Sequence, residues 1–148
     1  MAINKIYRGG VHRTTPETRE VKLGGSTKFK PGAVVELDAT NGVKVATAGE
    51  FFYVVGETLH GSVTDEYAIG DTMRLYSPRS GDLLAAQASA GITLSDDLAL
   101  TIDTAGTLKA ATVGTDTVFA YVDWPASEHP AVPSAATIAG QLIPIKIK

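Results

Sequence analysis

Residues 70–122 read GDTMRLYSPRSGDLLAAQASAGITLSDDLALTIDTAGTLKAATVGTDTVFAYV, and this stretch decides the fold class. Short apolar-rich runs alternate in it with clusters of Gly, Asp, Ser and Thr. Such runs, separated by turn residues, are typical of β-strands in an antiparallel sandwich or barrel. No run is long enough, or apolar at the right spacing, to predict an amphipathic helix. The predicted strands cover residues 73–76, 83–86, 98–102, 108–111 and 118–122.

The same pattern extends on both sides of this stretch. Further strands are predicted over residues 33–37, 43–47, 51–55 and 142–148. Asn41-Gly42 between two apolar runs favours a two-residue hairpin turn of type I′, because both residue types tolerate positive φ. Pro144 lacks a backbone donor, so the last strand is expected at a sheet edge or at a bulge. The sequence therefore predicts an all-β fold, a small antiparallel β-barrel or sandwich.

Two segments of the chain resemble each other without gaps. Residues 38–49 read DATNGVKVATAG and residues 103–114 read DTAGTLKAATVG, with identical residues at five of twelve positions. A predicted strand precedes each copy and another follows it. The repeat predicts two hairpins of similar construction, packed across one core.

The 148 residues suffice for one domain with its own core. Residues 1–30 lack hydrophobic periodicity, so we expect an extended N-terminal arm, followed by a single β domain over 31–148 with a Pro-rich loop at 125–140. The arm has seven basic and two acidic residues, whereas the remainder has six basic and fourteen acidic ones. Such an arm can dock on an acidic surface, or it can be a solvated charged tail.

No catalytic or metal-binding pattern is found, so we predict no enzyme, no cofactor and no metal. Cysteine is absent, and GxSxG, P-loop and GxGxxG motifs are missing. The three histidines, His12, His60 and His129, share no metal-ligand spacing. Asp96-Asp97 is expected to be a turn, because adjacent strand residues face opposite ways.

Membrane and nucleic-acid partners are not expected either. No apolar stretch approaches the length of a membrane span, and the N-terminus lacks the apolar region of a secretory signal, so synthesis in a cytoplasm is expected. The body is acidic, and the arm offers only Tyr7 for base stacking, which disfavours direct nucleic-acid binding.

The runs GDTMRLYSPRSGDLLAAQ, ITLSDDLAL, LKAAT and LIPIKIK together give a pattern that resembles small capsid decoration (cement) proteins of tailed bacteriophages. The resemblance covers residues 31–148 and rests on strands and turns. It implies a β domain on the outer surface of the virion head, synthesised in the bacterial host cytoplasm. On the virion head it would bind the major capsid protein, as a trimer in preference to a dimer, and bridge neighbouring capsid subunits.

In that family an N-terminal arm commonly becomes ordered on the capsid, which matches the basic residues 1–30. The candidate capsid contacts in the arm are Tyr7, Arg8, His12, Arg13, Arg19 and Lys22. The first alternative is a virion-associated adhesion or receptor/glycan-binding module whose tip is the 125–140 loop, with Trp124 beside it. A small β-barrel enzyme or ligand binder is the second alternative.

Overall fold

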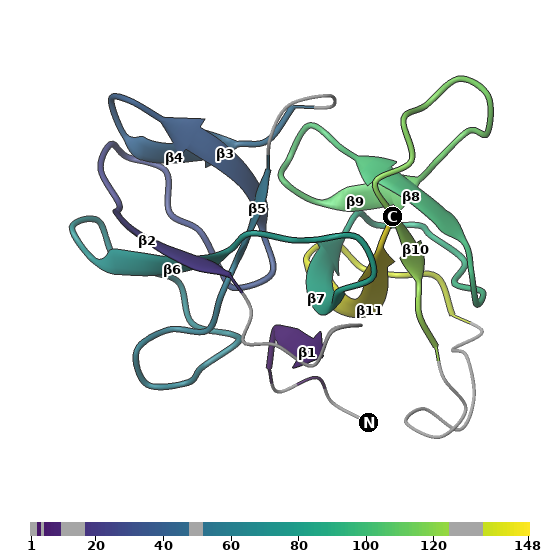
Figure 1. The fold of residues 1–148 in the computed structure, drawn as a ribbon, viewed down its shortest axis with the longest axis horizontal. Coiled ribbons are helices and arrows are strands. Elements are labelled where there is room, and N and C mark those ends of the chain that lie inside the picture. The colour runs from purple at the N-terminus through teal and green to yellow at the C-terminus, as the bar shows by residue number, and fades with distance from the viewer. Residues whose placement is uncertain (1–2, 4, 10–16, 48–51, 125–134) are drawn as a thin grey trace.

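The computed structural model describes residues 3, 5–9, 17–47, 52–124 and 135–148. These residues form eleven β-strands and no helix, so none of them makes a helix that could cross a membrane (Figure 1). The all-β prediction is confirmed. The strands are β1 (Tyr7–Gly9), β2 (Thr18–Lys22), β3 (Val34–Asp38), β4 (Gly42–Val45), β5 (Tyr53–Val55), β6 (Thr72–Tyr76), β7 (Leu83–Ala88), β8 (Ala99–Ile102), β9 (Leu108–Ala110), β10 (Ala120–Val122) and β11 (Gln141–Ile147).

Five of the strands close into a small barrel. The first sheet has the order β1-β7-β11-β10-β8-β9, and an additional pairing of β7 with β9 completes the circle. The closing pair is parallel, with Ala88 opposite Leu108, whereas the other pairs in this sheet are antiparallel. Closure removes the free edges of these five strands and leaves β1 attached outside the ring, on β7.

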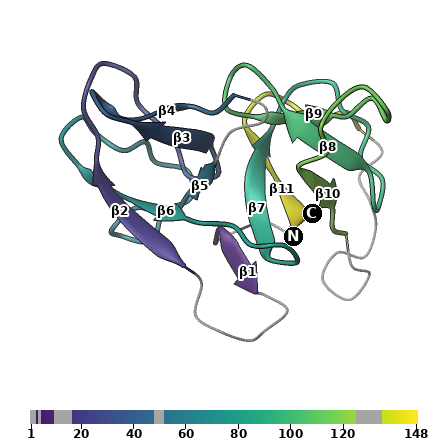
Figure 2. The same cartoon turned by 45° about the horizontal axis from the view of Figure 1, so that its top comes forward.

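The other five strands form a second sheet beside the barrel, in the order β2-β6-β5-β3-β4 (Figures 1 and 2). All its pairs are antiparallel, and β2 and β4 are its two edges. Alternate residues of this sheet point to opposite faces. Val34, Val54 and Tyr76 join the core of the barrel, whereas Val35, Val55 and Leu75 belong to a separate core. Phe29, from the segment between β2 and β3, and Tyr67, from the segment between β5 and β6, also belong to this second core.

The N-terminal segment is extended, as expected, but its described residues belong to the body. Strand β1 pairs with β7 and β2 pairs with β6. Ile6, Leu23 and Phe29 are at most 6% exposed and lie in the two cores. The expectation that residues 1–30 lie outside the core is therefore wrong for these residues. The apolar side chains are too widely spaced to give a periodic signal, and their burial depends on strands that are distant in sequence.

The turn at Asn41-Gly42 differs from the prediction. Asp38 lies opposite Gly42, so the loop has three residues, and Asn41 keeps a negative φ. Gly42 alone adopts a positive φ, of 83°. The Asn41 N–H donates to Asp38 Oδ2 at 3.0 Å, which fixes the loop without a type I′ turn.

Strand β11 lies inside the barrel wall, between β7 and β10, and keeps a continuous register with both, so the expectation of an edge strand or a bulge is wrong. Pro144 pairs with Ala85 of β7. The Ala85 N–H points away from β11 and donates to the carbonyl of Ile6, on the β1 side of β7. The backbone groups of Pro144 therefore face β10, where its carbonyl accepts a bond from the Asp123 N–H at 3.0 Å. Asp123 is the first residue after β10. The proline therefore removes only the bond that a backbone N–H at position 144 would donate, at the end of the ladder between β10 and β11.

Both segments of the internal repeat form hairpins, as predicted. One is β3–β4 in the second sheet and the other is β8–β9 in the barrel. They share the barrel core, and the Val34 N–H donates to the Gly106 carbonyl at 2.8 Å. The shared aspartates, Asp38 and Asp103, each accept a backbone N–H of their own loop. That common role explains why an aspartate suits the first position of both copies.

Candidate partner-binding surface

Two of the predicted capsid contacts, Tyr7 and Arg8, lie in β1 at the junction of the two sheets. The Tyr7 ring stacks on Tyr76 with 5.7 Å between ring centroids. Arg8 Nη1 lies 3.5 Å from Asp123 Oδ2, and the Arg8 side chain is 8% exposed. Both side chains thus hold β1 to the body, and their role as capsid contacts stays a prediction.

The carboxylate of Glu57 also binds the N-terminal segment to the second sheet. Its Oε1 accepts the Ile6 N–H at 2.5 Å, and its Oε2 accepts the Tyr76 hydroxyl at 2.8 Å. Burial of the Tyr76 ring, together with this hydrogen bond to a carboxylate, raises the pKa of Tyr76 to about 12. One carboxylate therefore links the residue before β1 to β6 and keeps the phenol protonated.

This link should weaken in alkaline solution. The unfolded chain releases the Tyr76 proton near pH 10, whereas the folded chain retains it to about pH 12. The stability that neutral Tyr76 contributes is thus complete below pH 10 and is lost as the pH rises to about 12. Urea unfolding across this range should show a smaller decline for Tyr76→Phe than for the natural chain. Tyr121→Phe serves as the control, and an equal decline in all three proteins would contradict the role of Tyr76.

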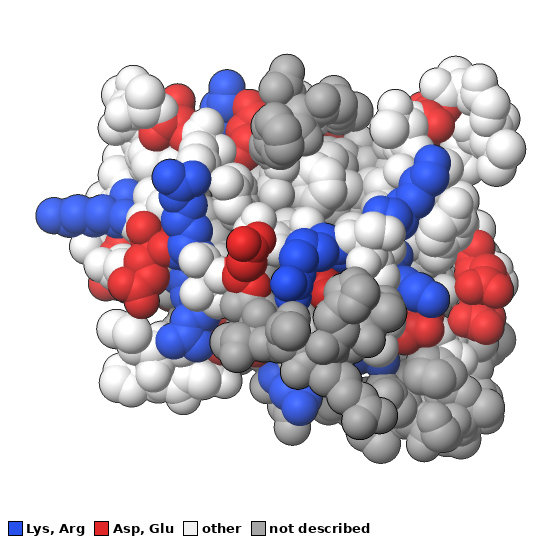
Figure 3. Space-filling view, in the orientation of Figure 1, with Lys and Arg blue, Asp and Glu red and all other residues white. Residues whose placement is uncertain are grey.

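Arg19 and Lys22 lie on β2, an edge strand whose residues are mostly exposed. Arg19 Nη1 donates to the Tyr53 hydroxyl at 3.3 Å across the sheet. Lys22 ends the strand and is exposed. Basic and acidic side chains are interspersed over β2 and β6, at the left of Figure 3. His12 and Arg13, the other two predicted contacts, lie outside the described residues.

The outer edge of β2 also offers backbone groups. The Ser77 N–H donates to the Glu17 carbonyl, and the Leu23 N–H donates to the Asp71 carbonyl. Odd-numbered residues therefore face β6, and the N–H and C=O groups of Thr18 and Glu20 face outward. Within the described residues these groups have no backbone partner. An unpaired edge of this kind can pair with a strand of another chain.

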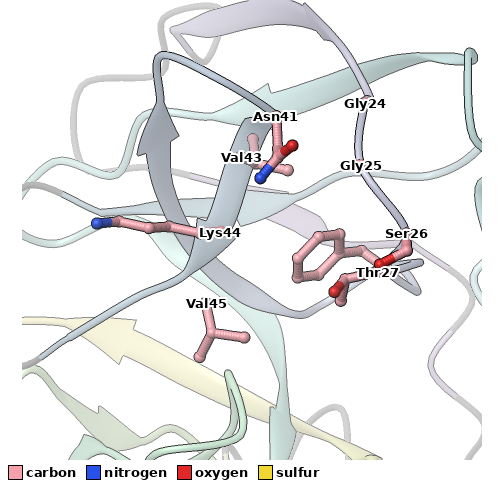
Figure 4. A pocket seen from close by; sticks show the side chains of 9 residues that line it. Gly24, Gly25, Ser26, Thr27, Asn41, Val43, Lys44 and Val45 are labelled. Carbon is pink, nitrogen blue, oxygen red and sulfur yellow. The ribbon is translucent and has the colours of Figure 1, made fainter.

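A groove of about 360 Å³ runs along the other edge of the same sheet. Strand β4 forms one wall, the segment from Gly24 to Thr27 forms the opposite wall, and the side chain of Lys44 points away from the groove (Figure 4). The two walls meet at one end, where the Gly24 N–H donates to the Asn41 carbonyl at 2.9 Å. Sequence reasoning missed this groove, because its only local signal, Gly24-Gly25, lies in the segment that was predicted to be an extended arm.

A smaller depression of about 220 Å³ lies between the loops that cover the second core. His60, Asp65 and Glu66 line it. Among the described residues, however, no three metal-ligating side chains come together. His60 is exposed and is the only histidine that the structure describes.

The hydroxyl and carboxylate groups at the end of β7 form a structural network. Ser89 Oγ donates to Asp103 Oδ2 at 2.7 Å and lies 2.7 Å from Thr107 Oγ1. The Thr137 hydroxyl donates to the Ser89 carbonyl at 2.6 Å. Hydrogen bonds from Ser89 and from the Thr104 N–H lower the pKa of Asp103. The network ties the β8–β9 hairpin to β7, and no described histidine contacts Ser89.

The acidic pair Asp96-Asp97 forms a turn, as predicted. Asp97 has a positive φ of 61°, and Asp96 Oδ1 accepts the Trp124 N–H at 3.0 Å. Trp124 itself is partly buried against the barrel core. Most of the predicted 125–140 loop, residues 125–134, lies outside the described residues.

The comparisons with known proteins found no match to this chain among the protein-family models or the curated proteins that were searched.

Proposed function

We propose that this protein is a non-enzymatic virion component that binds the outer surface of a phage head and stabilises the capsid by bridging major capsid subunits. The observation that carries the proposal is strand β2. Within the part of the chain that the structure describes, its outer backbone edge is unpaired and lies beside two basic side chains, Arg19 and Lys22. The resemblance of residues 31–148 to phage decoration proteins supplies the partner and the expected trimer.

The mechanism combines weak side-chain contacts with backbone pairing. Each exposed ion pair between β2 and an acidic capsid site contributes only about 0–1 kcal/mol. An added strand contributes main-chain hydrogen bonds that do not depend on side-chain identity. Many copies on one particle, each touching several subunits, turn these small contributions into a large collective stabilisation.

The test is co-sedimentation of the purified protein with undecorated heads. The natural chain should bind saturably at a fixed copy ratio, and high salt should weaken binding because exposed charges are screened. The double variant Arg19→Glu, Lys22→Glu should bind at least about tenfold more weakly. Lys146 and Lys148 lie exposed on the barrel, so Lys146→Glu, Lys148→Glu makes the same change in net charge as a control.

The two variants separate a local contact from an effect of net charge. Equal losses in both would leave β2 without a specific role. Absence of binding by the natural chain would refute the proposed function, and binding to cells or glycans would then favour an adhesion module.

A further inference from the structure

The groove beside β4 has the backbone pattern of a strand-acceptor site. The Ala46 N–H donates to the Val34 carbonyl, so even-numbered residues of this segment face β3. The N–H and C=O groups of Val43 and Val45 consequently point to the groove. Within the described residues these four groups have no backbone partner. An unpaired strand edge at the wall of a groove is a template for one added strand.

The opposite wall keeps this edge open. Gly25, with a positive φ of 72°, turns the chain away from β2, and Asn41 packs against it. A Cβ on Gly25 would lie 2.8 Å from Asn41 Oδ1, so a larger residue would displace the Asn41 side chain. The walls are joined at the Asn41 end, and further along Val43, which is 3% exposed, and the partly buried Val45 line the groove. The side chain of Phe29 supplies an apolar surface among the lining residues.

The charges around the groove select the occupant. Lys22, Lys28 and Lys30 are exposed on the chain that forms or flanks the wall opposite β4. Among the described residues, two carboxylates of the neighbouring strand β3 are already engaged: Glu36 with Lys44 and Thr47, and Asp38 with the Asn41 N–H. None of the described residues that line the groove is acidic, so the basic border favours an acidic partner segment.

We propose that the groove binds one extended segment of a partner protein as an added strand beside β4. The segment has small apolar side chains at alternating positions and acidic residues at its ends. Its backbone pairs with Val43 and Val45, and its acidic ends face Lys22, Lys28 and Lys30. The identification of the partner as the capsid subunit rests on the proposed function, whereas strand acceptance itself does not.

A synthetic peptide pair tests strand acceptance without any virion component. One peptide is Asp-Val-Thr-Val-Thr-Val-Asp, and its control carries lysine at both ends. In ¹⁵N-resolved NMR titrations of the full chain, the acidic peptide should saturably shift the Val43 and Val45 amides and slow their hydrogen exchange. The lysine-ended peptide should bind at least about tenfold more weakly. Absence of saturable shifts, shifts confined to other regions, or shifts caused by self-association would overturn the proposal.

Two variants locate the binding. In Val45→Pro the groove-facing donor is removed, while the pairing with β3 at Lys44 and Ala46 is left intact. This variant should lose the peptide-induced shift at Val43. The chain has no cysteine, so a single thiol in Thr27→Cys can carry a bulky label inside the groove. The labelled protein should lose peptide binding, whereas the same label on Thr115→Cys, in an exposed barrel loop, should not affect it.

The labelled proteins also connect the groove to the capsid. Loss of head binding with the label at Thr27, but not at Thr115, would identify the acceptor groove as a capsid contact. Full head binding with the label at Thr27 would overturn that assignment. If the unlabelled protein does not bind heads, the proposed function fails, and the peptide titration still decides whether the groove accepts a strand.

Discussion

A chain that begins at Gly32 should fail to fold. The deletion removes β1, β2 and, among the described residues, three large apolar side chains of the cores, Ile6, Leu23 and Phe29. Truncation of one buried large apolar side chain costs about 2–5 kcal/mol, whereas the whole free energy of unfolding of a domain is about 5–15 kcal/mol. The loss of three such side chains is comparable to that total. Strand β6 also loses its β2 ladder, and β7 loses its pairing with β1.

The measurement is thermal unfolding by circular dichroism, together with the dispersion of amide signals in NMR spectra. The Gly32 chain should show no cooperative transition and poor dispersion. A chain that begins at Lys5 is the control, because it keeps Ile6 and both strands, and the one described residue that it loses is the partly buried Ile3. A cooperative transition of the Gly32 chain near the natural temperature would contradict the structural role of the N-terminal segment. For this reason point variants in β2, and not this truncation, test head binding.

The local elements of the fold could be predicted from the sequence. Gly, Asp and Pro favour turns through their own backbone preferences, so the short apolar runs between clusters of these residues indicate strands. The nine strands predicted from residue 33 onward all correspond to strands in the structure, with ends that differ by a few residues. The hairpins of the internal repeat were found for the same reason, since each consists of neighbouring segments.

The positions of the strands within the sheets could not be predicted in this way. Pro144 predicts a sheet edge or a bulge, yet β11 is an inner strand in continuous register with both neighbours, because the proline lies opposite the first residue after β10. Leu23 and Phe29 are separated by polar residues and show no period, although both are buried by strands that follow later in the chain. The groove depends in turn on β4 being an edge, which only the full strand order reveals. Non-local pairing leaves little trace in a single sequence.

A second large loss of stability is expected for Gly42→Ala. Gly42 adopts a φ of 83°, which costs an alanine about 1–2 kcal/mol. A Cβ at this position would also lie 2.3 Å from the carbonyl oxygen of Lys22, a backbone atom that cannot rotate away. Overpacking of this kind typically adds about 1–3 kcal/mol. The two contributions together should lower the free energy of unfolding by about 2–5 kcal/mol.

Gly91 provides a matched control for the contribution of the backbone conformation. Its φ is also 83°, but a Cβ added there meets no atom within 4 Å. Gly91→Ala should therefore lose only the conformational part, about 1–2 kcal/mol. Urea unfolding of both variants measures the difference, which isolates the contact between β2 and the start of β4. Equal losses would show that the end of β2 can move away from Gly42 without cost.

The same substitution connects stability to the groove. The close approach of Lys22 and Gly42 is adjacent to the Gly24–Asn41 hydrogen bond, which joins the two walls. If Gly42→Ala separates these segments, the Gly24 amide should exchange faster with solvent, while amides in the barrel, such as that of Ala85, keep their protection. Peptide binding should weaken in the same variant, because its walls are no longer held at a fixed separation. Faster exchange at Gly24 with unchanged peptide binding would mean that β4 alone, without the opposite wall, holds the added strand.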